Sequence, residues 1–315
     1  MAKKIISIVT PFLNEEDNIR PFYDAVVDIA SSSEHSFEIV YVDDGSQDSS
    51  AEKVGKLPQA PLQIQLVRLS RNFGKEAAVS AGLSQVKGDA AIVIDVDLQH
   101  PIDKIPEFIE KWEKGADVVV GVRKHDGHHS FVKNITSRLF YKLINMVSET
   151  EIIPRATDYR LLSREVIDQF NQLTEHNRMT RGMIDWLGYD RAIVEFDANE
   201  RKYGSVRYSY RKLTKLAINT FVSYSFFPLR LAGYLGGFIA FASGVLGFFV
   251  IIENFLLNDP LSLKVTGTAM LTLVLLFLVG IVLVCLGLFG LYIASIYDEA
   301  QNRPVYVIRK NKKSL

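Results

Sequence analysis

The sequence predicts an α/β protein in which a mostly parallel sheet has helices on both faces, followed by a C-terminal pair of membrane-spanning helices. Between residues 5 and 200, short runs rich in β-branched residues alternate with longer segments of helical spacing. Strands that alternate with helices favour parallel pairing through crossover connections. Nearer the C-terminus, two long stretches contain no charged side chain, which indicates the membrane part.

Five runs have the composition of buried strands, since apolar and β-branched residues follow one another with few interruptions. They are IISIVTPF (5–12), FEIVYVDD (37–44), IQLVRLS (64–70), AAIVIDVD (90–97) and ADVVVGVR (116–123). The segments between them repeat apolar residues at helical spacing. The clearest are EDNIRPFYDAVVDIASS (16–32), KEAAVSAGLSQV (75–86) and IDKIPEFIEKWEKG (102–115).

Composition narrows the class of protein further. The chain has 315 residues with 36 Lys and Arg against 36 Asp and Glu, and 48% of its residues are hydrophobic. This hydrophobic content excludes a disordered chain, and the balanced charge gives no electrostatic footprint for nucleic acid. Cys285 is the single cysteine, so neither an intrachain disulfide nor a cysteine-based zinc cluster can form.

Polar and acidic residues follow three of the predicted strands. Pro11 to Glu16 follow the first strand, Asp43 to Ser46 the second, and Asp95 to His100 the fourth. Ligands of such folds bind beyond the carboxyl ends of the strands, so these turns are expected to meet at one edge. Carboxylates brought together repel one another unless a cation or hydrogen-bond donors lie among them. Taken singly, Asp-Asp-Gly-Ser is compatible with a plain turn and Asp-x-Asp with a helix start, but the ordered set predicts a metal and a polar ligand.

Two uncharged stretches, residues 231–252 and 265–297, are long enough to cross a bilayer, because about 20 apolar residues span its hydrocarbon core. The expected spans are residues 231–256 and 267–295. The alternative is a pair of buried core helices, which seldom run this long without a charge. Basic residues flank the pair, and only Lys264 is basic in the hairpin between them. The positive-inside rule therefore predicts a multi-pass protein of the cell inner (plasma) membrane, with the N-terminal part and both termini cytoplasmic.

These observations divide the chain into four parts. Residues 1–206 are expected to form the α/β domain, with an amphipathic interfacial helix at about 130–147. Residues 207–228 are expected to form a second amphipathic helix, 229–297 the two spans, and 298–315 a basic tail. Basic and aromatic residues on amphipathic segments favour the membrane surface, although packing on the protein interior gives the same periodicity.

Several ordered motifs carry a resemblance to a known family. They are TPFLNEE, VDDGS, LSRNFGKEAAVSAGL, DVDLQHP, TDYRLLSR, RGMIDWLGY and RKYGSVRYSYRKL. In this order, and with the two trailing uncharged stretches, the sequence resembles the family 2 glycosyltransferases of GT-A fold. Within that family it looks most like the polyprenyl-phosphate branch, which includes dolichyl-phosphate mannose synthase and the bacterial bactoprenol glucosyltransferases.

The resemblance implies a pocket for a nucleotide sugar at the carboxyl edge of the sheet. Its donor-binding residues would be Pro11, Asn14, Glu15, Asp43, Asp44, Arg71, Lys75 and Asp95. Carboxylates can accept from an imide N–H or ribose hydroxyls, and Lys75 supplies positive charge for a diphosphate. Arg71 and Lys75 are also compatible with a solvated helix N-terminus.

The resemblance also implies a metal site and catalytic carboxylates. Asp97 and Gln99 would ligate Mg²⁺ or Mn²⁺, since both ions prefer oxygen ligands and complete their coordination with phosphate oxygens. Asp95 would contact the sugar or ribose, or support the metal. Asp158 matches the position usually assigned as the catalytic base; alternatively it orients the acceptor or the sugar, or caps the helix that follows it. Asp158 and Asp95 are thus the catalytic candidates.

The implied acceptor is a polyprenyl phosphate, whose phosphate needs cationic and hydrogen-bonding partners. The candidates are Arg123, Arg201, Lys202, Ser205 and Arg207. Guanidinium groups suit phosphate oxygens, although the basic residues near 201–207 could instead grip anionic lipid headgroups.

Together these features predict an inverting transferase that moves one hexose from a nucleotide sugar, with UDP-glucose favoured, to undecaprenyl phosphate or another polyprenyl phosphate. UDP-N-acetylglucosamine and GDP-mannose are the alternative donors, and a non-catalytic membrane scaffold that retains the fold is the alternative class. The expected partners are the nucleotide sugar, the lipid and the membrane, without nucleic acid. A homo-oligomer, such as the tetramers that relatives can form, is compatible with the sequence.

Overall fold

The computed structural model describes residues 3–124, 153–176, 178–197 and 267–309, together with the single positions Tyr234, Phe238 and Val245. The chain divides into two compact units. One comprises Met1–Arg207 with Arg303–Leu315, and the other comprises Tyr208–Asn302. The predicted amphipathic helices at 130–147 and 207–228 lie outside the described residues, as does the first predicted span at 231–256 apart from the three single positions.

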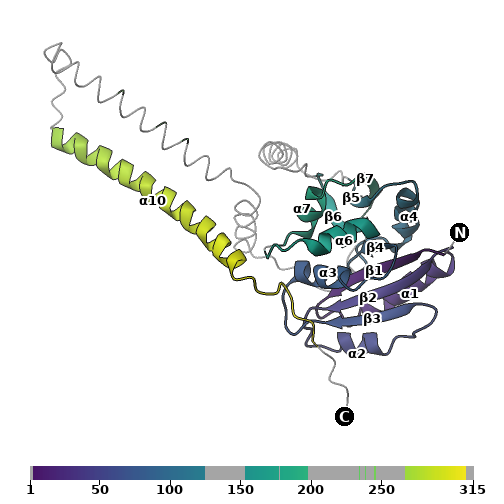
Figure 1. The fold of residues 1–315 in the computed structure, drawn as a ribbon. Coiled ribbons are helices and arrows are strands. Elements are labelled where there is room, and N and C mark those ends of the chain that lie inside the picture. The colour runs from purple at the N-terminus through teal and green to yellow at the C-terminus, as the bar shows by residue number, and fades with distance from the viewer. Residues whose placement is uncertain are drawn as a thin grey trace. The chain divides into compact units, whose positions relative to one another are not determined.

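A seven-stranded sheet forms the centre of the first unit, in the order β3-β2-β1-β4-β6-β5-β7 (Figure 1). The strands are β1 (Ile5–Phe12), β2 (Ser36–Asp43), β3 (Gln63–Arg68), β4 (Ala90–Val93), β5 (Val118–Arg123), β6 (Ala156–Ser163) and β7 (Arg191–Phe196). Neighbouring strands are parallel except for β6, which runs antiparallel to both β4 and β5. The prediction of a mostly parallel sheet is confirmed.

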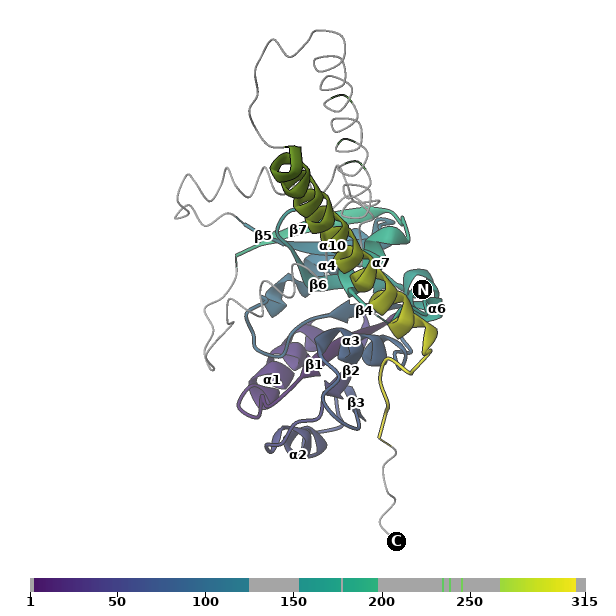
Figure 2. The same ribbon diagram turned by 90° about the vertical axis from the view of Figure 1, so that its left-hand side faces the viewer.

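Helices cover both faces of this sheet (Figures 1 and 2). They are α1 (Ile19–Ser31), α2 (Ser50–Gly55), α3 (Lys75–Leu83), the 3-10 turn η1 (Ile102–Lys104), α4 (Ile105–Glu113), α6 (Arg164–Gln172) and α7 (Thr180–Trp186). Phe22 of α1 and Phe108 of α4 share one core cluster with Ile8 of β1. Ala78 of α3 and Val166 of α6 share the other with Val9. Because β1 is buried on both faces, its sequence is mostly apolar, with only Ser7 and Thr10 as polar residues.

Strand β6 inserts between β4 and β5, and its register decides where the catalytic candidates lie. Ala90 pairs with Ser163, and Val93 pairs with Arg160. Since paired residues of an antiparallel ladder advance in opposite directions, two further steps put Asp95 across from Asp158. Two carboxylates that are far apart in the sequence are therefore neighbours at the carboxyl edge of β4.

The segment formed by residues 303–309, called the C-terminal strap below, lies along the far edge of the sheet at the end of β3. An antiparallel bridge joins Leu69 to Ile308. The amide of Ser70 donates to the carbonyl of Val307 (2.8 Å), and the amide of Arg309 donates to the carbonyl of Arg68 (2.7 Å). The sequence predicted only a basic tail here, because a single bridge leaves no periodic pattern to detect.

Helix α10 (Gly267–Ala300) occupies the region of the second predicted span and belongs to the second unit. Within the part of the chain that the structure describes, no helix combines the length and the apolar character needed to cross a membrane.

Candidate active site

The turns that follow β1 and β2 are joined to each other by hydrogen bonds. The amide of Asn14 donates to Ser46 Oγ (3.0 Å), and the Asn14 side-chain oxygen accepts from the amide of Gln47 (2.9 Å). Asn14 adopts a positive φ of 55°, a conformation that Asn tolerates better than most residues. Glu15 follows, and its carboxylate accepts a hydrogen bond from the side-chain amide (Nδ2) of Asn18 at 2.6 Å. The two turns thus form one wall at the carboxyl edge, as the sequence predicted.

Asp43 and Asp44 are both buried, and their carboxylates accept hydrogen bonds from backbone and side-chain groups of the surrounding segments. Asp44 accepts from the amides of Phe73 (2.7 Å) and Gly74 (2.9 Å) in the loop between β3 and α3. Burial raises the pKa of the Asp44 carboxyl, although these two amides oppose the shift. Asp43 forms a 3.1 Å ion pair with Arg68 Nε. Both carboxylates therefore hold the turn after β2 to its neighbouring segments, a role beyond the direct ligand contact predicted for them.

Gly45 is a point of close approach between this wall and the β3–α3 loop (residues 69–74). Its φ is +81°, and a Cβ there would lie 2.7 Å from Arg71 C and Asn72 N. We expect Gly45→Ala to destabilise the protein by about 1–3 kcal/mol, because both the backbone conformation and the loop must change. Urea unfolding measures this, with Gly55→Ala as the matched control because a Cβ at Gly55 meets nothing within 4 Å. Equal stability of the two variants would contradict the close approach.

The β3–α3 loop carries the basic residues expected beside the ligand. The Arg71 guanidinium lies 4.0 Å from the centre of the Phe73 ring, and its side chain is exposed. Gly74 has a φ of +99° and turns the chain into helix α3, which begins at Lys75. Lys75 is therefore set by the loop before it as well as by its own helix.

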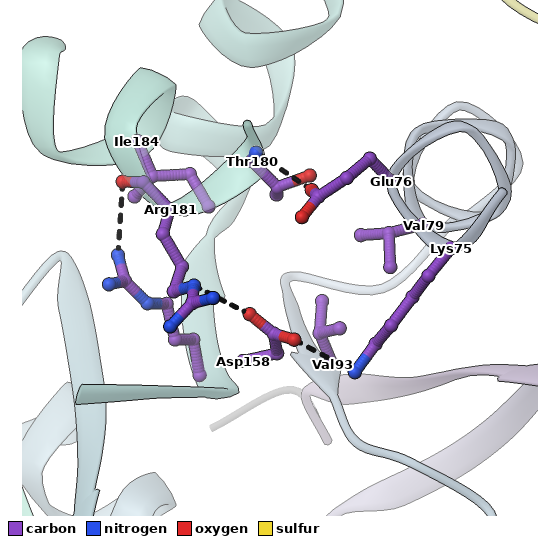
Figure 3. Close-up of a pocket in the computed structure, with 9 residues that line it drawn as sticks. Lys75, Glu76, Val79, Val93, Asp158, Thr180, Arg181 and Ile184 are labelled. Atoms are coloured by element: carbon purple, nitrogen blue, oxygen red, sulfur yellow. Dashed lines mark hydrogen bonds and ion pairs between the residues drawn. The ribbon is translucent and has the colours of Figure 1, made fainter. Parts of the chain in front are cut away.

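Lys75 joins the two carboxylates that the register of β6 brings together. Its ammonium lies 2.6 Å from Asp95 Oδ1 and 2.8 Å from Asp158 Oδ2. On the other side of Asp158, Arg181 Nε lies 2.9 Å from Oδ1, an ion pair without the alignment of a hydrogen bond. Figure 3 shows Lys75 and Arg181 pointing toward Asp158 from opposite sides. The two catalytic candidates and one donor-binding candidate thus form a single charged cluster.

The charges of this cluster set its protonation state. Burial by itself would raise the pKa of the Asp158 carboxyl, but the charges of Lys75 and Arg181 outweigh burial and hold it below its usual range. Burial would likewise lower the pKa of Lys75, and the charges of Asp95 and Asp158 raise it instead. At neutral pH Asp158 and Lys75 are therefore both ionised, so Asp158 can orient a cation or accept a hydrogen bond.

Arg160 and Asp185 form a buried ion pair beneath the cluster. Arg160 Nη1 lies 2.9 Å from Asp185 Oδ1, and the two side chains are only 2% and 8% exposed. Arg160 also donates to the carbonyl of Arg181 at 3.5 Å. The pair ties β6 to helix α7 and so holds Arg181 beside Asp158. A second contact from α3 fixes the same helix, since Glu76 accepts from the amide of Thr180 at 2.8 Å.

The residues predicted to ligate a metal follow β4 in a tight turn. Asp97 Oδ1 accepts from the amide of Gln99 at 3.1 Å, and Leu98 between them has a φ of +60°. Among the described residues, no three His, Cys, Asp or Glu side chains gather into a metal-binding group. Asp97 and Gln99 still carry oxygen ligands that fit Mg²⁺ or Mn²⁺, because such ions bind through one or two carboxylates together with substrate phosphates.

His100 follows this turn, and its side chain is buried in the core. It is 5% exposed, and its ring contacts those of Tyr159 and Phe196 at centroid distances of 5.4 and 5.6 Å. Burial lowers the pKa of the imidazole, so the ring is neutral at physiological pH and packs as an aromatic side chain. Its Nδ1 lies 3.7 Å from Asp95 Oδ2.

The acceptor-phosphate candidates are only partly covered by the structure. Arg123 is the last residue of β5, and its side chain is exposed. Its positive charge contributes to the lowered pKa of His100. The other four candidates, Arg201, Lys202, Ser205 and Arg207, lie outside the described residues. Pro11 lies near the end of β1, where its position pairs with Val42 of β2.

Sequence reasoning did not place Arg160, Arg181 or Asp185 among the site residues. Arg181 and Asp185 belong to the RGMIDWLGY motif and Arg160 to TDYRLLSR, so the motifs contained the signal. Their roles depend on helix α7 packing beside β6, a long-range contact that the local pattern does not reveal.

Fold and site together define an α/β protein with a cluster of charged side chains at the carboxyl edge of its sheet, the edge at which such folds bind ligands. Residues 7–170 match the family described as glycosyl transferase family 2. A prophage-derived bactoprenol glucosyl transferase of Shigella flexneri is 39% identical over 98% of each chain. An uncharacterized glycosyltransferase of Synechocystis is 37% identical over 96% of this chain and 94% of that protein. The chain belongs to glycosyl transferase family 2 and is a glycosyltransferase.

Among solved structures, glucosyl-3-phosphoglycerate synthase from Mycobacterium tuberculosis is also similar to this chain. That enzyme was solved with Mn²⁺, UDP-glucose and phosphoglyceric acid; it is 17% identical, with a TM-score of 0.44 that covers 70% of this chain and 78% of that chain.

Proposed function

We propose that this glycosyltransferase moves one glucose, with inversion, from UDP-glucose to a polyprenyl phosphate. The observation that carries the proposal is the cluster in which Lys75 and Arg181 hold Asp158 opposite Asp95. The choice of substrates is supported by the bactoprenol glucosyl transferase of Shigella flexneri, to which the chain is similar over 98% of its length.

The chemistry of the acceptor limits what the protein must supply. A phosphate monoester has a second pKa near about 6, so it is largely a dianion at neutral pH and needs little help from a base. Asp158, already ionised beside two cations, then orients the reactants instead of removing a proton. Lys75 and Arg181 supply positive charge on the side of the site where the diphosphate leaves. Asp95 holds Lys75 in that position.

A divalent metal belongs to the same proposal. Asp97 and Gln99 would hold Mg²⁺ or Mn²⁺, which supplies further neutralisation of the leaving diphosphate. The tight turn places Asp97 and Gln99 two residues apart, and the oxygen ligand that each side chain carries supports this assignment.

The proposal also includes the membrane. Two uncharged stretches flanked by basic residues support a C-terminal transmembrane hairpin, with the catalytic domain and both termini in the cytoplasm. A polyprenyl chain stays in the bilayer, so its phosphate is presented at headgroup level. Arg123, Arg201, Lys202, Ser205 and Arg207 are the proposed partners of that phosphate.

A donor panel tests the function directly. The full chain, purified in detergent, is supplied with a short polyprenyl phosphate, Mn²⁺ and radiolabelled UDP-glucose, UDP-N-acetylglucosamine or GDP-mannose. We expect labelled lipid chiefly from UDP-glucose and none after chelation with EDTA. Preferential transfer from another nucleotide sugar would mean that UDP-glucose is not the donor. Full activity in EDTA would mean that the reaction needs no divalent metal. Absence of transfer to the lipid phosphate from all three donors would overturn the acceptor.

A further inference from the structure

The C-terminal strap contacts helix α3 and the loop before it at several points, and its first residue, Arg303, also meets His176 through its carbonyl. Its two backbone hydrogen bonds reach Arg68 and Ser70, at the end of β3 and the start of the β3–α3 loop. Tyr306 donates from its hydroxyl to Ser84 Oγ at 3.0 Å, and Ser84 is the C-cap of α3. The strap therefore touches both the approach to α3 and its far end.

The elements beneath the strap are those that shape the donor pocket. Arg68, whose carbonyl accepts from the strap, also pairs with the Asp43 carboxylate at 3.1 Å. The loop that starts at Ser70 supplies the Phe73 and Gly74 amides to Asp44. Lys75 then begins the helix and reaches Asp95 and Asp158.

Within the loop, the other restraints are the hydrogen bonds of Phe73 and Gly74 to Asp44 and the close approach to Gly45. Its residues Ser70 and Arg71 are exposed, and Asn72 is exposed as well. A backbone hydrogen bond contributes about 1 kcal/mol net, so two such bonds at the start of a short loop can decide its position. The strands β1 and β2 are almost wholly enclosed, and the hydrogen bonds of the strap named above reach neither of them. Loss of the strap should therefore first displace the β3–α3 loop, together with its contacts to Asp44 and the position of Lys75.

We infer that the C-terminal strap is a positioning element of the donor pocket: it holds the β3–α3 loop so that Asp44 and Lys75 meet a nucleoside diphosphate in the correct geometry. This role rests on the proposed function, since the ligand is the nucleotide part of the donor. The strap residues do not touch the reacting atoms in this scheme, and they act through the loop.

The backbone hydrogen bond of Arg309 offers a clean test. Arg309→Pro removes both the side chain and the amide that donates to Arg68, whereas the matched control Arg309→Ala removes only the side chain. We expect Arg309→Pro to weaken UDP binding about fivefold relative to Arg309→Ala, which corresponds to the loss of about one backbone hydrogen bond. The KM for the donor should rise by a similar factor, while kcat at saturating donor changes by less than about twofold.

Hydrogen exchange supplies a readout that does not depend on the reaction. The Phe73 and Gly74 amides should exchange faster in Arg309→Pro than in Arg309→Ala, with the β1 and β2 amides unchanged. Unchanged exchange at these two amides, together with equal UDP affinity, would overturn the role of the strap. If the wild-type chain binds no UDP, the proposed function fails, and the exchange comparison still tests the strap.

A side-chain variant covers the case in which Arg309→Pro does not fold. Tyr306→Phe removes the hydroxyl that donates to Ser84 and keeps the ring against the core. We expect a rise of about twofold in the dissociation constant for UDP, in line with the loss of one exposed hydrogen bond. Wild-type affinity in this variant, when Arg309→Pro cannot be measured, would count against the proposal.

Discussion

Asp158→Asn is expected to lower kcat about 10³-fold with little change in the fold. The substitution keeps the shape of the side chain but removes the charge that Lys75 and Arg181 share, at 2.8 and 2.9 Å from its two oxygens. Positioned carboxylates and preorganised charges at a reacting centre contribute factors of about 10²–10⁴. Steady-state transfer with saturating donor and lipid measures the loss.

Binding and pH supply the controls for this variant. UDP affinity should stay within about threefold of the wild type, since the effect is expected in the transition state. A kcat within about tenfold of the wild type would show that Asp158 is dispensable. The lowered pKa also makes a prediction for stability: the charge interactions of Asp158 are complete above its unfolded pKa of about 3.9 and are lost as the pH falls below it. The stability difference between wild type and Asp158→Asn should therefore shrink below about pH 4.

Asp185→Ala is expected to destabilise the protein by about 3–5 kcal/mol. It leaves the Arg160 guanidinium, which is only 2% exposed, without its buried counter-charge. Arg191 also loses a carboxylate at 3.7 Å. Because Arg160 donates to the backbone of Arg181, we expect activity to fall together with stability.

Denaturant unfolding measures the change, and two further variants show its cause. Asp168→Ala breaks an exposed pair with Arg164, in which the Asp side chain is 56% exposed, and should alter stability by no more than about 0.5 kcal/mol. The double variant Arg160→Met with Asp185→Leu should recover much of the lost stability, since an apolar pair can replace a buried ion pair. A loss below about 1 kcal/mol in Asp185→Ala would mean that water reaches Arg160.

Local sequence patterns were sufficient for much of the fold. The strands β1, β2 and β5 are rich in apolar residues because both of their faces are buried, so they could be predicted without any long-range contact. The acidic turns after β1, β2 and β4 follow from chain order alone, since parallel strands place their carboxyl ends at one edge. Strand β6 was missed as a strand because it contains Asp158 and Arg160, whose charges break the apolar pattern.

The sequence by itself determined the alternation of strands and helices, the residues at the carboxyl edge and the family resemblance, because periodicity and residue order express each of these locally. The tertiary structure decided which of these residues contact one another. The antiparallel register of β6 put Asp158 across from Asp95, the packing of α7 brought Arg181 to the same carboxylate, and the return of the C-terminal strap covered the start of the β3–α3 loop. Each of these contacts joins residues far apart in the chain, so none of them leaves a local pattern. Strand pairing, side-chain packing and charge pairing in the folded state select them.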